Sequence, residues 1–151
     1  MPLQRTKHWA TRELHKAFRA RRNMPFMWGE NDCALFAADV VRAFTGVDIA
    51  ADFRGKYTDE AGAFALIATV TGSTAPRATA VGDAAAWCAA KHGLVELEHP
   101  LLAQRGDLVA VESGGNLIAG IVHLNGKHVV SMAESGPVRL SILDVKRAWR
   151  V

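Results

Sequence analysis

The chain has 151 residues, of which half are hydrophobic and 22% are charged. This length suits one domain with a substantial core, and the composition is that of an ordinary globular protein. No apolar run reaches the ~20 residues needed to span a bilayer, and no apolar segment of a secretory signal follows the polar, basic start. We therefore expect a single domain over residues 1–151, with no membrane span and no signal peptide.

The net charge of +3 is unevenly distributed, because basic residues crowd the first part of the chain. They are Arg5, Lys7, Arg12, Lys16, Arg19, Arg21 and Arg22. These charges do not alternate with aromatic residues, as they do on many surfaces that stack nucleic acid bases. The pattern favours the solvated face of a helix, or contact with a protein partner, over nucleic acid binding.

Helical patterns come first along the chain. Apolar residues at helical spacing predict a basic helix over about 8–22, which ends before Pro25. A second, largely buried helix is expected from Cys33 to about Thr45, capped by Asp32 or Asn31 and ended by Gly46.

The next segment, residues 47–57, reads as irregular. Thr58 is positioned to cap a third helix over roughly 59–70, and a fourth helix over about 82–92 is expected to end at Gly93. Cys88 lies within this fourth helix among small apolar residues. It is therefore interpreted as a buried core residue.

After Gly93 the pattern changes to short β-rich runs. Strands are predicted over residues 94–97, 107–112, 117–124, 127–133 and 138–142, and a final helical turn over 144–149. Asn125-Gly126 between two of these runs predicts a hairpin with a two-residue loop, in which Leu124 pairs with Lys127 and His123 with His128. The predicted class is α+β, with N-terminal helices followed by a small antiparallel sheet.

One segment raises a catalytic hypothesis, because Trp28-Gly29-Glu30-Asn31-Asp32 brings Cys33 to the first turn of a helix. Unpaired N–H groups and the helix dipole favour a thiolate at that position. A buried structural cysteine is the alternative, since free cysteine is commonly buried. The only other cysteine is Cys88, so the chain has no disulfide framework, and neither cysteine has the spacing of a zinc site.

The order of several motifs resembles the papain-like NlpC-type cell-wall peptidases, and more closely a set of small phage tail proteins related to them. The resemblance covers about residues 24–151. Its motifs are Trp-Gly-x-x-Asp-Cys at 28–33, Phe-Ala-Ala-Asp at 36–39, Gly-x-Asp at 46–48, Phe-Arg-Gly-x-Tyr at 53–57, Gly-Asp-hydrophobic from 106, and Ala-Trp-Arg at 148–150. The resemblance implies a papain-like NlpC-type fold.

The same resemblance assigns the nucleophile to Cys33 and the histidine base to the position of Ile118, in Ile118-Ala119-Gly120-Ile121. Isoleucine cannot accept a proton, so the implied catalytic pair is incomplete. Strand alternation places residue 118 on one face of its strand and His123 on the other. We therefore expect His123 and His128 to point away from the position of a catalytic base.

Other polar residues have simpler interpretations. His123 and His128 form a candidate metal pair, but no third ligand accompanies them, so no metal site and no cofactor are expected. Asp39 is expected to pair with a basic residue such as Arg54, and Trp28 either packs on the loop before Cys33 or lines a cleft.

The sequence therefore predicts a structural or assembly component of a phage-type tail tip or baseplate. In this interpretation the protein resides in the virion tail and contacts tail-hub proteins through the basic first helix and residues 146–151. The rival is an active cysteine peptidase or amidase that uses Cys33 to cleave peptidoglycan during DNA entry. A nucleic-acid-binding module is a third, weaker interpretation.

Overall fold

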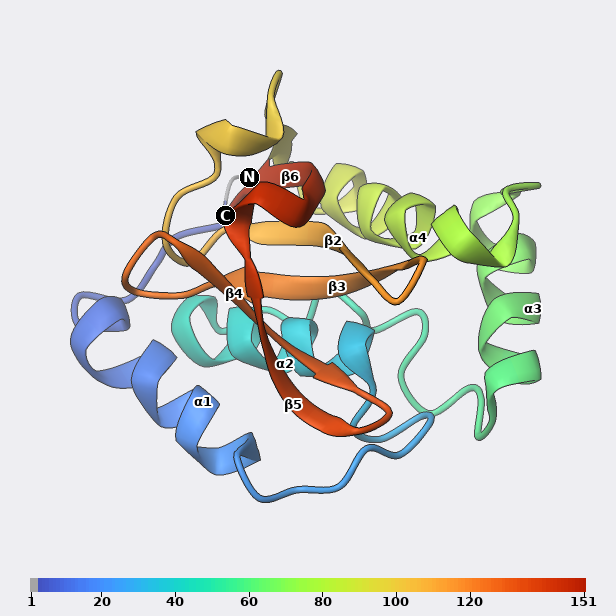
Figure 1. Ribbon diagram of the computed structural model, residues 1–151, viewed down its shortest axis with the longest axis horizontal. Coiled ribbons are helices and arrows are strands. Elements are labelled where there is room, and N and C mark those ends of the chain that lie inside the picture. Colours follow the sequence, from blue (N-terminus) through green and yellow to red (C-terminus); the bar gives the residue numbers. More distant parts are fainter. Residues whose placement is uncertain (1–2) are drawn as a thin grey trace.

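A computed structural model describes residues 3–151 as helices followed by an antiparallel sheet, so the predicted α+β class is confirmed (Figure 1). A π-helical turn, Trp9–Glu13 (η1), leads into α1 (Leu14–Arg21), and α2 (Cys33–Thr45), α3 (Glu60–Thr71) and α4 (Arg77–Lys91) follow. The strands are β1 (Val95–Glu96), β2 (Leu108–Ser113), β3 (Asn116–Val122), β4 (His128–Ala133), β5 (Gly136–Ser141) and β6 (Val145–Arg150). Short 3-10 helices, Pro100–Leu102 (η2) and Ile142–Asp144 (η3), flank β2 and β6.

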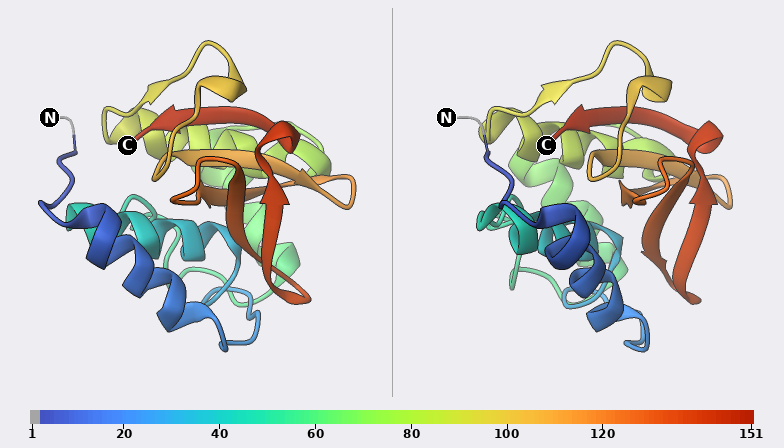
Figure 2. Two further views of the ribbon diagram at one scale, coloured as in Figure 1. Left: turned by 60° about the vertical axis from the view of Figure 1, so that its left-hand side comes forward. Right: turned by 90° about the vertical axis from the view of Figure 1, so that its left-hand side faces the viewer.

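The six strands pair in the order β1-β6-β2-β3-β4-β5, and every pair is antiparallel. Helices α2 and α4 pack on one face of this sheet (Figures 1 and 2). That face contributes Ala110, Ala119 and Ile121 to the main core, while Val109, Val111 and Val122 point to a smaller core on the other face. This alternation is the period of two that a strand imposes.

Helix α2 lies at the centre of the main core, and its ends form as the sequence predicts. The Asp32 side chain caps its N-terminus by accepting the backbone N–H of Leu35 at 2.9 Å. Gly46 ends it in the left-handed conformation with φ of 80°. Most of its side chains between these caps are buried, including Leu35, Phe36 and Phe44. Such an apolar circumference is stable only inside a core.

The boundaries of three other elements differ from expectation. Asp59, and not Thr58, caps α3, because its carboxylate accepts the backbone N–H of Gly62 at 2.7 Å. Helix α4 begins at Arg77 rather than near residue 82, since Pro76 is compatible with a helix start. The basic N-terminal helix extends from Trp9 to Arg21 and opens with the π-helical turn.

The predicted helical turn over 144–149 is wrong, because most of this segment is strand β6. It lies between β1 and β2 and buries Val145, Ala148 and Trp149. The segment is an internal strand of the sheet, so residues 146–151 offer a partner only the side chains that β6 leaves exposed, such as Lys146. The docking role expected of this segment and of the first helix stays a prediction.

The β3–β4 hairpin has the predicted register but a longer loop. Ile121 pairs with Val130, and the backbone N–H of His123 donates to the carbonyl of His128 at 2.8 Å. Leu124 and Lys127 do not form a strand pair. Instead, the Asn125 side-chain oxygen accepts the N–H groups of Lys127 and His128, so residues 124–127 form the loop.

A buried carboxylate at the start of β2 joins the two ends of the described chain. Asp107 is fully buried and accepts hydrogen bonds from Arg5 (3.1 Å), Arg150 (2.8 Å) and the backbone N–H groups of Val151 and Gln104. The preceding Gly106 has φ of 85°, and a Cβ there would lie 2.7 Å from the Trp9 ring. The Gly-Asp-hydrophobic motif therefore has a structural purpose at this junction.

No helix within residues 3–151 has the length and apolar character that crossing a membrane requires.

We expect Asp107→Ala to lower the free energy of unfolding by about 3 kcal/mol, because it leaves two arginines and two backbone donors without their acceptor. Denaturation in urea at pH 7 measures this change. Glu112→Ala is the matched control on strand β2, which Asp107 directly precedes, since Glu112 forms only an exposed pair with Lys146 at 3.8 Å. The control should change stability by less than ~0.5 kcal/mol, and equal losses for the two variants would contradict the assignment.

Candidate functional site

The loop before Cys33 is held by a single buried carboxylate. One oxygen of Asp32 caps α2, and the other accepts the backbone N–H of Gly29 at 3.0 Å and the hydroxyl of Tyr57. Asp32 is only 1% exposed, so these donors replace the water that it would otherwise bind. Burial and the neighbouring Asp32 charge raise the pKa of Tyr57, which keeps the phenol protonated as a donor.

Gly29 is required at its position for two reasons. Its φ of 83° lies in the left-handed region, and a Cβ there would overlap the carbonyl oxygen of Tyr57. The segment that ends at Tyr57 therefore lies directly against the Trp28–Asp32 loop. This contact joins two of the motifs, Trp-Gly-x-x-Asp-Cys and Phe-Arg-Gly-x-Tyr.

A network of ion pairs and hydrogen bonds connects α2 to α1 and to the loop before Cys33. Asp39 pairs with Arg54 at 2.7 Å and also with Arg21 of α1, so the predicted Asp39–Arg54 pair is confirmed. Arg54 also binds Asp48 through two hydrogen bonds, of 2.8 and 3.1 Å. Arg21 reaches Asn31 at 2.9 Å, which connects the network to the loop before Cys33.

Cys33 is the first residue of α2, and it is 9% exposed. Burial is the largest effect on its thiol and raises its pKa to about 12, although the backbone of Ala119 on β3 and the start of α2 act in the opposite direction. Removal of the thiolate from water therefore outweighs the stabilisation that the helix N-terminus offers. The thiol is protonated at neutral pH.

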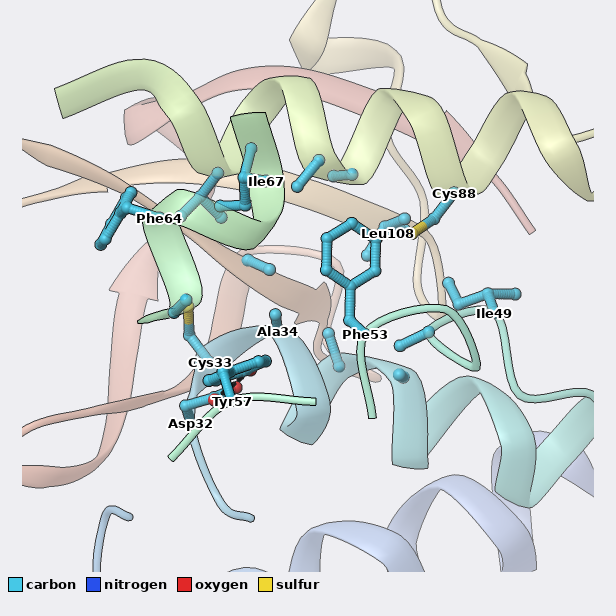
Figure 3. Close-up of a pocket in the computed structure, with 18 of the residues that line it drawn as sticks. Asp32, Cys33, Ala34, Ile49, Phe53, Tyr57, Phe64, Ile67, Cys88 and Leu108 are labelled. Atoms are coloured by element: carbon cyan, nitrogen blue, oxygen red, sulfur yellow. Dashed lines mark hydrogen bonds between the residues drawn. The ribbon is translucent and has the colours of Figure 1, made fainter. Parts of the chain in front are cut away.

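The sulfur borders an apolar cavity of about 70 Å³ between α2, α3, α4 and the segment before Tyr57 (Figure 3). Trp28, Phe53, Tyr57 and Phe64 supply aromatic walls. Cys88 of α4 also lines this cavity, with Phe53 between the two cysteines in Figure 3. Burial raises the pKa of Cys88 to about 12 as well, in agreement with its predicted place in the core.

The structure brings no histidine of residues 3–151 to the wall of this cavity. Ala119, and not Ile118, lines it opposite Cys33, while Ile118 packs against the smaller core on the other face of the sheet. Residues 118 and 123 lie on opposite faces, as expected, but the face turned toward Cys33 is that of Ala119 and not that of Ile118. The expectation that His123 points away from the Cys33 face is therefore wrong. His123 lies on the same side of the sheet as Ala119 but does not line the cavity. Its ring instead stacks on that of Phe18 of α1, with 6.0 Å between the ring centroids.

The position of Tyr57 was not predicted, although it completes the site. Its partner Asp32 is distant in sequence, and no spacing rule connects a loop tyrosine to a helix cap. The Trp28 ring packs on that of Phe26 in its own loop, with 5.0 Å between the ring centroids, and it also lines the cavity. The expected packing on the loop and the expected place at a cavity wall are therefore both observed. Among the described residues, no group of three or more His, Cys, Asp or Glu side chains is placed to bind a metal.

A comparison with known protein families identifies a match over most of the chain. A family described as a domain of unknown function, DUF6950, matches residues 4–151. No curated protein matches the chain.

The Gly29 contact gives a test with a matched control. We expect Gly29→Ala to lower the free energy of unfolding by about 2–4 kcal/mol, because the cost of the left-handed conformation adds to the cost of the overlap with Tyr57. Gly55 has a similar φ of 78°, but a Cβ added there meets only open space. Gly55→Ala should therefore lower the free energy of unfolding by about 1 kcal/mol. Urea unfolding measures both, and equal losses would show that the Tyr57 contact does not matter.

The Cys33 thiol also predicts a pH dependence. The unfolded thiol loses its proton near pH 8.5, whereas the folded thiol keeps it to about 12. Between these values the unfolded state binds fewer protons, so stability falls as pH rises, by up to about 1.4 kcal/mol per pH unit for this group. We expect Cys33→Ala to have a shallower decline than the wild type in urea unfolding from pH 8 to 10. Parallel profiles would contradict a buried thiol.

Proposed function

The chain belongs to the family described as a domain of unknown function, DUF6950, and we propose that it is a structural or assembly component of a phage-type tail tip or baseplate. In this proposal it has the papain-like NlpC-type fold of a cell-wall peptidase without a complete catalytic site. It resides in the virion tail and binds other tail-tip or hub proteins.

The observation that carries this proposal is the environment of Cys33. A cysteine nucleophile needs a thiolate and a base within hydrogen-bond reach. Here the sulfur borders an apolar cavity, its pKa is raised to about 12, and no described histidine lines that cavity. These features favour a packing role for Cys33 over nucleophilic catalysis.

The structural use of the motifs gives further support. Asp32, Tyr57 and Arg21 hold the loop before α2, and Asp107 joins both ends of the described chain. A protein that serves as an assembly part needs this rigid framework but needs no reactive thiol. The motifs are therefore compatible with a peptidase-like fold that performs no cleavage.

The exposed side of the first helix is the proposed contact surface. Lys16, Arg19 and Arg22 are exposed and form no ion pair within residues 3–151, whereas Arg5 and Arg21 bind carboxylates of their own chain. Exposed cations of this kind suit an acidic surface on a protein partner.

The rival function is cysteine-dependent cleavage of peptidoglycan. It needs an opening that exposes Cys33 and a base that comes from elsewhere in the chain or from a partner. Digestion of purified muropeptides by the wild type and Cys33→Ser discriminates the two functions. We expect no product from either protein, and cleavage that disappears in Cys33→Ser would overturn the structural proposal.

Thiol reactivity is an independent measure of the same site. At pH 7.5 we expect Cys33 in the folded protein to react with a thiol reagent at least about 100-fold more slowly than in urea, because the native thiol is buried and protonated. Cys88→Ala isolates the signal of Cys33. Fast labelling in the native protein would indicate an exposed thiolate and favour the peptidase.

Assembly itself can be tested in cells that produce the tail particles. We expect mass spectrometry to detect the chain in purified particles, and Cys33→Ala to be incorporated as well as the wild type. Substitution of Lys16, Arg19 and Arg22 together by Gln should reduce incorporation without unfolding the protein. Absence of the wild-type chain from intact particles would refute a tail role.

A further inference from the structure

Two histidines and an arginine gather at the loop between β3 and β4, beside α1 (Figure 1). His123 and His128 face each other across the hairpin. Nη2 of Arg139 on β5 lies 3.5 Å from Nε2 of His123. The His123 ring stacks on Phe18 of α1 with an interplanar angle of 8°, which fixes its orientation.

Hydrogen bonding determines which nitrogen of His123 carries the proton. The backbone N–H of Asn125 donates to Nδ1 of His123 at 3.1 Å. A neutral imidazole whose Nδ1 accepts a hydrogen bond has its proton on Nε2. The Nε2–H group therefore lies beside the guanidinium of Arg139, which is also a donor. No side chain or backbone group of residues 3–151 accepts a hydrogen bond from either of these two donors.

The same asparagine determines the tautomer of His128. Its Oδ1 accepts the N–H groups of Lys127 at 2.8 Å and His128 at 3.1 Å, which identifies that atom as the oxygen. Asn125 Nδ2 therefore donates to Nδ1 of His128 at 2.8 Å, and His128 also has its proton on Nε2. Coordination of a metal by Nε2 needs the opposite tautomer, so this pair is poorly arranged for a metal.

The cluster has positive charge without a carboxylate to balance it. Within residues 3–151, no ion pair joins an Asp or Glu to Arg139, His123, His128 or the nearby His15 of α1. Burial, followed by the charge of Arg139, lowers the pKa of His123, and His128 and His15 act in the same direction, whereas a hydrogen bond with the Asn125 side chain acts in the opposite direction. These groups repel additional protons in the absence of an anion.

We propose that Arg139 and His123, with His128 across the hairpin, form a binding site for an oxyanion, namely a carboxylate or a phosphate group, and that the guanidinium of Arg139 and the Nε2–H of His123 are its donors. The planar guanidinium suits two oxygens of such a group, and the Nε2–H of His123 supplies a neighbouring donor. A bound oxyanion provides the acceptor that both donors lack. The site lies outside the Cys33 cavity and does not depend on the tail function proposed above.

Imidazole NMR tests the site directly. Long-range proton–nitrogen spectra of the labelled protein at pH 7.5 should show both histidines as the Nε2–H tautomer. Inorganic phosphate and acetate are then added separately, with sodium chloride adjusted to keep the ionic strength constant. We expect saturable shifts at His123 and His128 and an increase in the pKa of His123, because an anion favours the protonated imidazole.

Arg139→Gln should weaken binding of the probe at least about tenfold, since it removes the charged, forked donor. Arg139→Lys keeps the charge without the fork and should give an intermediate loss. Lys56→Gln is the control, because it removes an exposed charge in the segment between α2 and α3 and should change affinity less than twofold.

Dependence on Arg139 with either probe supports the site, and the tighter probe identifies the preferred group. The proposal is overturned if chloride alone gives the same shifts, or if Lys56→Gln weakens binding as much as Arg139→Gln. Nδ1–H tautomers at both histidines would also refute it, because the paired donors would then be absent.

Discussion

The burial of the Asp32 carboxylate is the constraint on which the arrangement around α2 depends. Its oxygens cap the helix, bind the N–H of Gly29 and accept the hydroxyl of Tyr57. A buried carboxylate is stable only when its oxygens receive such donors, so the two loops that supply them must lie together. Cys33 directly follows Asp32 in the chain. The hydrogen bonds of the Asp32 carboxylate therefore also hold Cys33 at the edge of the cavity.

The buried carboxylate of Asp107 has a similar role, because it accepts hydrogen bonds from both ends of the described chain. It brings Arg5, Arg150 and the backbone of Val151 to the start of β2. Together the two carboxylates give a structural role to motifs that resemble those of an active site. Their polar residues satisfy buried groups, and their glycines allow close approach of backbone or aromatic rings.

The chemistry of Cys33 shows how tertiary packing can oppose a local effect. A helix N-terminus stabilises a thiolate, which is the physical basis of the catalytic hypothesis. Burial at the edge of the cavity, beside its aromatic walls, removes the water that a thiolate needs. The desolvation is larger, so the thiol stays protonated. At the candidate oxyanion site the charge is instead favoured, because the Arg139 guanidinium is exposed to solvent and forms no ion pair with a carboxylate of residues 3–151.

The sequence by itself determined the α+β class, most elements, both ends of α2 and the register of the β3–β4 hairpin, because caps, turns and periodicity are local properties. It also predicted the Asp39–Arg54 pair from charge alone. Only the tertiary structure decided that residues 145–150 form an internal strand, that Ala119 faces Cys33, and that Tyr57 binds Asp32. These outcomes depend on contacts between segments far apart in the chain, where desolvation and strand pairing outweigh local preference.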